Sequence, residues 1–331
     1  RAIFYADLVR AWGDVPARFE PISNETLYLA KSDRDVIYKQ LIKDLAEADS
    51  LAFWPNESEY TKKSNRVNKA FIKALRARIC LVAAGYSQRP DSDNPRLSND
   101  PELDKTKLYK IAEADLLALH GNAQAGKLET SFEQVFRNIC EENLTAGGES
   151  LWEIPMSSGR GRMAYTFAIR HQAIDQYTGM TQGSQVGPTP NFFYDYDVND
   201  IRRDVTCVPY RWSNNAKAVQ DLNALNNWSF GKYRFEWMTR KVGDKAQDDG
   251  LNKQYMRFAE VVLMLAEVSN ELHGPSAAAP YLKEIRRRAF NSSLQQTKVE
   301  DYVNALTSKE DMFNAIVNDH AFEFAGEMLR K

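Results

Sequence analysis

Apolar residues recur at the three-to-four-residue spacing of helices in the first and last thirds of this 331-residue chain. Glycine or proline follows most of these runs, as in Gly13 and Pro16 after the first, and both residues commonly end helices. The pattern predicts helices over residues 1–12, 33–51, 66–84 and 104–120, from about 251, after Gly274-Pro275, and from 308.

Polar residues at the expected helix starts support these boundaries. Ser32 is placed to cap the second helix, and Ser308 is placed to cap the last one, with Asp311 three residues further on. The third helix has a face of small residues that would allow a neighbouring helix to come close. This face consists of Ala70, Ala74, Ala77, Leu81 and Ala84.

Two more helical patterns lie near the C-terminal end. The arginines at 286–288 close the second helix of this part, where cations suit the negative helix end, and we interpret them as a solvated end. The last helix has one mostly apolar face, on which His320 is interpreted as a core histidine. This face consists of Phe313, Val317, His320, Phe324 and Met328.

The middle of the chain has a different pattern. Residues 122–250 are rich in Gly, Ser, Asn and Pro, and only residues 150–155 and 232–238 alternate as short strands do. We therefore predict one mainly α domain over 1–331, with helical parts at 1–121 and 251–331. Helix pairs with short turns favour a tetratricopeptide-like helical-repeat scaffold with a large irregular loop region and few short β-strands, although no 34-residue period is present.

Composition removes several classes of function. The net charge is -2 and the pI is about 6.2, so there is no electrostatic case for nucleic-acid binding. No apolar run approaches the roughly 18 residues that span a membrane. The three cysteines, Cys80, Cys140 and Cys207, are too far apart to indicate a disulfide framework or a thiolate zinc site.

Motifs of metal and nucleotide chemistry are present only in degraded form. GNAQAGKL at 121–128 resembles a phosphate-binding loop but has Leu128 where Ser or Thr would hold magnesium, so we interpret it as a turn. DYDVND at 195–200 begins like a calcium loop, but lacks the glycine and the final glutamate. An irregular calcium site at Asp195 and Asp197 remains an alternative to pairing of these carboxylates with Arg202 and Arg203.

No set of residues indicates a catalytic centre, a cofactor or a metal site. The four histidines are far apart in sequence, and no Ser–His–Asp pattern is present. His120 is interpreted as a cation at a helix end. The 45 acidic residues leave a pair of glycosidase carboxylates open, because one sequence offers too many pairs to choose from.

The candidate ligand-binding residues are aromatic side chains among Asn, Asp, Gln and Arg in the loop-rich middle. An aromatic ring can stack on the C–H face of a sugar, and nearby amides and carboxylates can bind its hydroxyls. The alternative is that these rings anchor the loops to the helices. The candidates are Tyr177, Tyr194, Tyr196, Tyr210, Trp212 and Trp228.

Six segments in order resemble the SusD/RagB family, the glycan-binding outer-membrane lipoproteins of Bacteroidetes. FYADLVRAWGDVPARFEP resembles the family's helix that runs into Gly-Asp-(Val/Ile)-Pro, and MRFAEVVLMLAEVSNELHG resembles its Arg-Tyr-Ala-Glu-Val-Leu-Leu-Met segment. The others are SDRDVIYKQLIKDLAEADSL, RVNKAFIKALRARICLVAAG, LKEIRRRAF and AIVNDHAFEFAGEMLRK. In the last, Asp319-His320 replaces Glu-Arg and Ala325-Gly326 replaces Glu-Gly, so a motif arginine and its ion pair are missing.

The resemblance implies a non-enzymatic protein that captures oligosaccharides or polysaccharides at the cell surface. It implies a SusC-like TonB-dependent transporter as partner, and an outer-membrane location through an N-terminal lipid anchor upstream of residue 1, with the chain truncated at both ends. A peptide- or protein-binding helical-repeat scaffold and a glycan-degrading enzyme remain alternatives.

Overall fold

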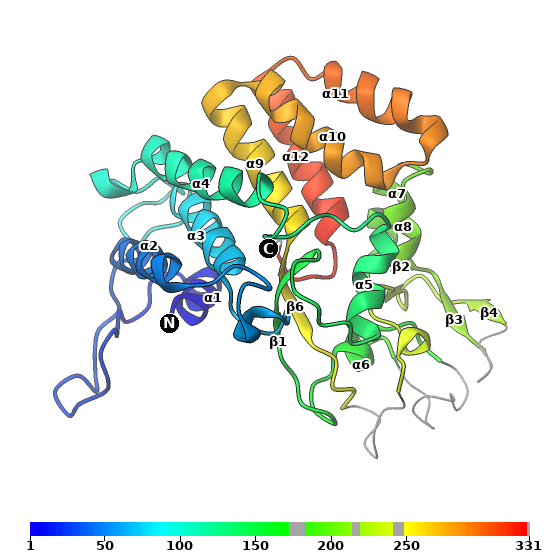
Figure 1. Cartoon of the computed structure of the whole chain (residues 1–331), viewed down its shortest axis with the longest axis horizontal. Helices are drawn as coiled ribbons and strands as arrows, with labels where there is room; N and C mark the ends of the chain where they lie inside the picture. The colour runs from blue at the N-terminus through cyan, green and yellow to red at the C-terminus, as the bar shows by residue number, and fades with distance from the viewer. Residues whose placement is uncertain (172–182, 214–218, 241–247, 330–331) are drawn as a thin grey trace.

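The computed structural model describes residues 1–171, 183–213, 219–240 and 248–329 (Figure 1). Helices at the two ends of the chain lie beside each other, and the loop-rich middle occupies the opposite side of the molecule, with the short strands β3 and β4 at its edge. The architecture is mainly helical with a few short strands, which confirms the predicted fold class.

The first four long helices have nearly the predicted bounds. They are α1 (Ala2–Trp12), α2 (Arg34–Leu51), α3 (Lys69–Ala83) and α4 (Lys105–His120). The cap of α2 is Asp33 rather than Ser32, because the Asp33 carboxylate accepts the N–H of Asp35. Gly13 has a φ of 74°, which glycine adopts readily, and a Cβ there would lie 2.8 Å from Nη2 of Arg34. Arg34 in turn pairs with Asp14, so the Gly13-Asp14 turn docks α1 onto the start of α2.

The small face of α3 has the predicted effect. Ala70, Ala74 and Ala77 are completely buried, and α3 packs against both α2 and α4. Small side chains at these positions let two helices approach α3 closely.

Among the described residues from 122 to 257, the chain forms short helices and three two-stranded antiparallel ribbons. The helices are α5 (Phe132–Cys140), α6 (Met163–Phe167), α7 (Pro190–Asp195) and α8 (Ile201–Thr206). The strands are β1 (Ser150–Ile154), β2 (Cys207–Val208), β3 (Tyr210–Trp212), β4 (Gln220–Leu222), β5 (Ser229–Phe230) and β6 (Lys253–Arg257). β1 pairs with β6, β2 with β5 and β3 with β4.

One of the two predicted strands is correct and the other is wrong. Residues 150–155 contain β1, but residues 232–238 turn into a short 3-10 helix at Phe235–Trp237. The alternate aromatic side chains of this segment, Tyr233, Phe235 and Trp237, are buried, and Lys232 at a polar position is buried as well. The aromatic positions of the alternation therefore reflect burial and not a strand. A strand also needs a hydrogen-bonded neighbour, and the described residues provide none for 232–238.

The C-terminal helices are α9 (Phe258–His273), α10 (Pro275–Ala289), α11 (Tyr302–Asn304) and α12 (Lys309–Phe324). The prediction of a helix from about 251 was wrong at its start, since Tyr255 lies in β6. Ser308 caps α12 by accepting the N–H of Asp311, as predicted. The buried face of α12 is offset from the predicted one, because Met312, Ile316 and Asp319 are buried whereas Phe313 is exposed.

The main core joins the two helical parts. α4 packs on α9, and α9 also packs on α10 and α12. The rings of Phe71, Trp152 and Tyr255 meet where α3 faces the β1–β6 ribbon, with Phe71 and Trp152 ring centres 4.8 Å apart. This contact joins segments from both ends and the middle of the sequence.

Residues 121–128 form a turn after α4 that leads into the loop before α5, as predicted for a sequence that is not a phosphate-binding loop. A phosphate-binding loop would follow a strand and open a helix. Across the described part of the chain, none of the helices has the length and apolar character required to cross a membrane.

Candidate functional site

The candidate aromatic residues lie in two places. Tyr194 lies on α7, Tyr196 directly follows this helix and Trp228 packs against its Phe193. Tyr210 and Trp212 lie on β3. Tyr177 lies outside the described residues. The structure therefore separates the predicted set into groups with different surroundings.

The group around α7 mostly packs against the scaffold. Tyr196 is only 5% exposed, its ring lies 4.5 Å from that of Phe322, and its hydroxyl donates to the carbonyl of Phe322 at 2.8 Å. Trp228 is 8% exposed and packs edge-on against Phe193. Tyr194 is 73% exposed. Tyr196 and Trp228 thus have the contacts of loop anchors, and Tyr194 offers its ring to solvent.

Tyr210 and Trp212 form a partly exposed aromatic pair. They are two residues apart on β3, so their side chains lie on the same face of the strand. Their ring centres are 5.2 Å apart in a T-shaped arrangement. The backbone N–H of Trp212 donates to the carbonyl of Arg170 at 2.9 Å, which fixes the strand beside the preceding loop.

The polar edges of this pair are held by one neighbouring segment. The indole N–H of Trp212 donates to Oε1 of Glu236 at 3.1 Å, and the charge of Arg234 acts on the nearby Tyr210 hydroxyl, whose pKa it lowers. Burial outweighs this effect and raises the pKa of Tyr210, so its hydroxyl keeps its proton at neutral pH. Both rings are therefore held rigidly while their faces remain partly accessible.

Charges and amides surround the pair. Burial opposes ionisation of Glu236, but His171 and Arg234 outweigh it and lower the pKa of this carboxyl group. Gln220 lies directly opposite Trp212 across the β3–β4 ribbon, and the backbone N–H of Asn223 donates to the carbonyl of Pro209 beside Tyr210. A ligand on this ribbon would meet aromatic faces beside the side-chain amides of Gln220 and Asn223.

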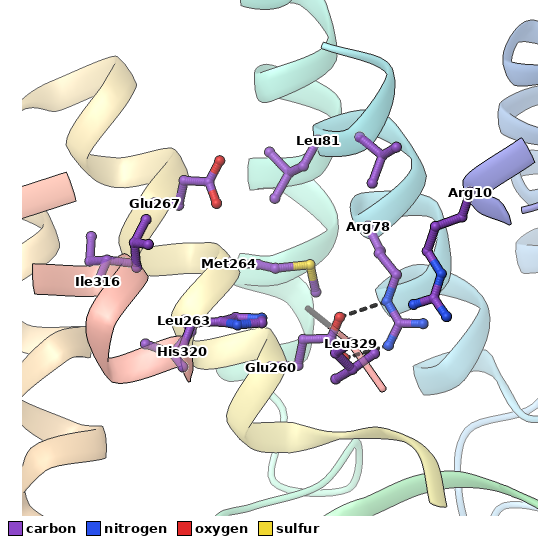
Figure 2. A pocket seen from close by; sticks show the side chains of 12 residues that line it. Arg10, Arg78, Leu81, Glu260, Leu263, Met264, Glu267, Ile316, His320 and Leu329 are labelled. Carbon is purple, nitrogen blue, oxygen red and sulfur yellow. Dashed lines mark hydrogen bonds and ion pairs between the residues drawn. The ribbon is translucent and has the colours of Figure 1, made fainter. Parts of the chain in front are cut away.

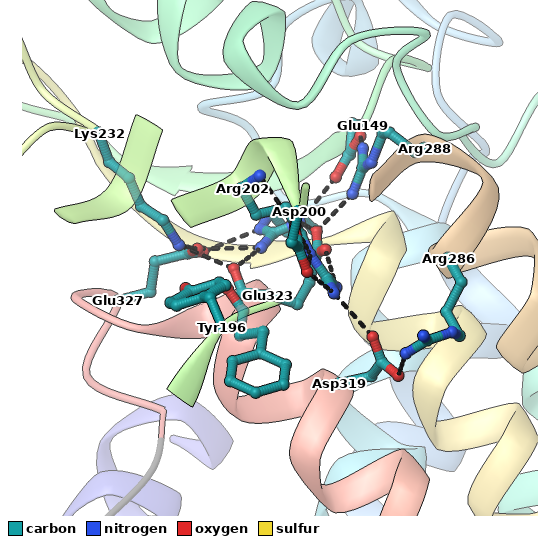
Figure 3. A network of polar contacts seen from close by, with 12 residues as sticks. Glu149, Tyr196, Asp200, Arg202, Lys232, Arg286, Arg288, Asp319, Glu323 and Glu327 are labelled. Atoms are coloured by element: carbon teal, nitrogen blue, oxygen red, sulfur yellow. Dashed lines mark hydrogen bonds and ion pairs between the residues drawn. The ribbon is translucent and has the colours of Figure 1, made fainter. Parts of the chain in front are cut away.

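A buried ionic network joins the loop-rich middle to the C-terminal helices (Figure 3). It connects basic and acidic side chains from the loop-rich middle with others from β6, α10 and the end of α12. We call it the ionic network. Its members are Glu149, Asp200, Arg202, Lys232, Arg257, Arg286, Arg288, Asp319, Glu323 and Glu327.

Arg257 and Glu323 are the most connected members of the ionic network. Nη1 of Arg257 donates to Glu149 at 2.8 Å and to Glu323 at 2.6 Å, and its other nitrogens donate to Glu327. Glu323 also pairs with Arg202 and Arg288. Burial would raise the pKa of Glu323, but the neighbouring arginines outweigh it and lower this pKa. Close pairing compensates for removing these charges from water.

The ionic network corrects one sequence interpretation and shows the partners of Asp319. Arg286 and Arg288 are buried, with Arg286 bonded to Asp319 at 2.7 Å and Arg288 bonded to Glu149 and Glu323, so the arginine run is not a solvated helix end. Only Arg287 of the three is exposed. Asp319-His320 stands where the family has Glu-Arg. Asp319 pairs with Arg202 from α8 and Arg286 from α10.

The acidic stretch at 195–200 is engaged by basic side chains. Asp200 pairs with Arg202 at 2.7 Å, whereas Asp197 pairs with Lys298 at 2.6 Å and not with the predicted Arg202 or Arg203. Arg203 pairs with Asp204 instead. Within the ranges that the structure describes, no three His, Cys, Asp or Glu side chains gather as a metal site requires, so the calcium alternative at Asp195 and Asp197 has no support there.

The cysteines and His120 have structural surroundings. Cys80, Cys140 and Cys207 are free and buried, and burial raises the pKa of each thiol to about 12. His120, at the end of α4 as predicted, contacts Glu284 at 2.8 Å, and this hydrogen bond raises its pKa. Thiols with such pKa values are poor nucleophiles at neutral pH.

A separate cavity of about 360 Å³ lies among α1, α3, α9 and α12 (Figure 2). Most of its wall is apolar, including Leu263, Met264 and Ile316, and half-buried His320 lies at its edge. Its charged groups already have partners, since Arg78 pairs with Glu260. None of the described candidate aromatics lines this cavity, so it is distinct from the ribbon site.

A sequence model of the SusD family matches residues 148–331, more than half of the chain. The chain belongs to the SusD family. All members of the ionic network lie inside the matched range. The family's glycan-binding members are non-catalytic.

Two curated relatives of this SusD-family chain come from Formosa agariphila. They are SusD-like protein P2, 25% identical over 351 residues, and SusD-like protein P25, 25% identical over 361 residues. Both matches cover 100% of this chain, which spans 62% and 61% of the lengths of these two relatives.

Solved structures with the same fold are also similar to this SusD-family chain. A SusD homolog from Bacteroides thetaiotaomicron superposes with a TM-score of 0.81 at 21% identity, covering 98% of this chain and 64% of that one. Surface glycan-binding protein A from the same species, in complex with laminarihexaose, gives 0.66 at 17% identity and covers 99% and 65%. These likenesses confirm the SusD fold that the sequence motifs predicted.

Sequence reasoning missed the residues that hold the aromatic pair. In the sequence, Arg234 and Glu236 occupy polar positions of the strand predicted at 232–238, and nothing there indicates a role in the binding site. Their spacing of two residues does match the spacing of Tyr210 and Trp212, but no local signal relates segments that lie 24 residues apart. Only the folded chain brings them together.

Proposed function

We propose that this chain binds oligosaccharides or polysaccharides at the cell surface, without cleaving them, and passes them to a TonB-dependent outer-membrane transporter. The carrying observation is the Tyr210–Trp212 pair, whose polar edges are held by Arg234 and Glu236 while its rings stay partly exposed. Rings that are already ordered lose little conformational freedom on binding, which favours affinity. Membership of the SusD family supports the same function.

The carboxylate beside the pair does not have the protonation state of a glycosidase's general acid. A glycosidase needs a carboxylic acid that keeps its proton near neutral pH. The lowered pKa of Glu236 keeps it ionised, and its Oε1 atom already accepts the indole N–H of Trp212, so it holds the ring instead of supplying a proton. Delivery to a transporter would then exploit local concentration, because a weakly held glycan is retained beside the pore.

A polysaccharide panel in affinity electrophoresis, followed by calorimetry with oligosaccharides, tests this function. Retention of at least one glycan, with no reducing sugar released, is expected. Trp212→Ala should weaken that binding at least tenfold, because truncating a central aromatic contact commonly costs about 2 kcal/mol or more. Trp228→Ala is the matched control, as its ring is buried against Phe193.

Other outcomes would identify the alternatives. Release of reducing sugar would contradict the non-catalytic proposal. Binding of oligopeptides with no glycan retained would favour a peptide-binding scaffold. Equal glycan affinity for the parent and Trp212→Ala would exclude the ribbon as the site.

A further inference from the structure

Lys232 occupies an unusual position for a lysine. Its side chain is 2% exposed, and Nζ donates to the carbonyl of Glu323 at 2.7 Å and to Oε1 of Glu327 at 2.5 Å. The rings of Phe132 and Phe136 on α5 lie 5.2 and 4.9 Å from the same nitrogen. The ammonium group thus joins α5 and the end of α12, far from water (Figure 3).

Lys232 begins the segment that holds the aromatic pair. Arg234 and Glu236 follow it by two and four residues, and Nε of Arg234 bonds back to the carbonyl of Gly231 at 2.8 Å. Gly231 passes so close to α8 that a Cβ there would lie 2.4 Å from the carbonyl oxygen of Val205. The segment is therefore fixed at its start, and its next polar side chains reach Tyr210 and Trp212.

We infer that Lys232 is a positioning residue for the glycan-binding surface: it fixes the segment of Arg234 and Glu236 against the end of α12, and through them orients Tyr210 and Trp212. This inference rests on the proposed function of the aromatic pair. Lys232 itself does not touch the ligand, because it is buried beneath the segment.

The ionic network does not depend on Lys232 for its own hydrogen bonds. Nη2 of Arg257 also donates to the carbonyl of Glu323, at 2.7 Å, and Arg257 donates to both carboxylate oxygens of Glu327 at 2.9 Å. Removal of the ammonium group therefore leaves neither of its acceptors unpaired. The distinct contribution of Lys232 is its covalent connection to the loop that carries Arg234 and Glu236.

The charged surroundings of Lys232 make its positioning role sensitive to pH. Glu323 and Glu327 face it from the end of α12, Arg257 from β6, and the neutral Cys207 thiol from β2, whereas α5 presents only aromatic rings. Burial lowers the pKa of Lys232 to about 8. Its attraction to Glu327 should weaken as the pH rises from about 7 to 9.

The test compares Lys232→Met with Lys253→Met, a control on β6, in the 331-residue chain. The probes are laminarihexaose, xylohexaose, chitohexaose and an oligogalacturonate, titrated by calorimetry from pH 6.5 to 9.5. We expect Lys232→Met to lower the melting temperature, because Glu327 loses a buried positive partner, and to weaken binding fivefold or more at temperatures where the variant remains folded. Affinity of the parent should fall around pH 8, and that of Lys232→Met should not.

Hydrogen–deuterium exchange over residues 229–240 provides a readout that needs no glycan. Exchange should be faster in Lys232→Met than in the parent and the control. Parent-like exchange, or a parent-like pH profile of affinity in Lys232→Met, would overturn the inference. If no probe binds the parent, the proposed function fails for these glycans, and the exchange rates still decide whether Lys232 orders this segment.

Discussion

The indole N–H of Trp212 and the Oε1 atom of Glu236 are joined by a 3.1 Å hydrogen bond, across 24 residues of sequence. This bond fixes the orientation of the Trp212 ring. The first prediction follows from it: Trp212→Phe keeps an aromatic face but removes the N–H. We expect glycan affinity to fall about two- to fivefold, the equivalent of about 0.5–1 kcal/mol for one lost hydrogen bond.

Calorimetry against the best glycan of the panel measures this effect, with Trp228→Phe as the control. A loss as large as that of Trp212→Ala would mean that the hydrogen bond, rather than the ring face, dominates binding.

Glu323→Gln should strongly destabilise the fold. Glu323 is completely buried and pairs with Arg202, Arg257 and Arg288, so its neutralisation leaves buried arginines with too little negative charge. Such a change typically costs about 3–5 kcal/mol. Urea denaturation measures the free energy of unfolding, and Asp204→Asn, in an exposed pair with Arg203, should change it by less than about 1 kcal/mol. Equal effects of the two substitutions would contradict the importance of the ionic network.

Asp249 should make the free energy of unfolding fall as the pH rises, whereas a paired carboxylate with a lowered pKa makes it rise. Burial raises its pKa from 3.8 to about 6, although the backbone N–H groups of Leu251 and Tyr165 oppose this shift. Its contribution to stability is therefore complete below about pH 3.8 and is lost as the pH rises to about 6.

Asp249→Asn stays neutral at every pH. Its free energy of unfolding, relative to the parent, should therefore rise by about 2–3 kcal/mol between pH 3.5 and 7.5. Denaturation at several pH values measures the difference. A constant difference across this range would show that Asp249 ionises as readily in the folded chain as in the unfolded one.

Ala74→Leu should destabilise the helical scaffold. Ala74 is completely buried on the face of α3 that packs between α2 and α4, so a larger side chain has no room there. Overpacking of this kind costs about 1–3 kcal/mol. Val82→Leu, at a half-exposed position of the same helix, is the control in thermal unfolding. Parent-like stability of Ala74→Leu would show that α3 can shift to accommodate it.

Local features of the fold were largely predictable from the sequence. The bounds of α1, α2 and α4 and the cap at Ser308 follow from side chains within one or two helical turns. Residues 232–238 show the limit of this approach. Their alternate aromatic side chains are buried, but so is the neighbouring Lys232, and a strand also needs a partner from elsewhere in the chain.

Only the residue types of the candidate site could be predicted from the sequence. The aromatic residues of the middle were visible in the sequence, but their individual exposure was not, since it depends on Phe193 beside Trp228 and Phe322 beside Tyr196. The interpretation of the arginines at 286–288 as a solvated helix end was wrong for the same reason. The partners of Arg288 are Glu323, 35 residues away, and Glu149, 139 residues away.

Local periodicity, caps and ordered motifs are enough to identify the family, the helical scaffold and the loop-rich region. Folding places Tyr210 and Trp212 in a held pair, whereas it packs Tyr196 and Trp228 inward. It also buries Lys232, Arg286 and Arg288 in the ionic network. The physical reason is that exposure and ion pairing depend on neighbours in space, and the neighbours that matter here lie tens to more than a hundred residues apart.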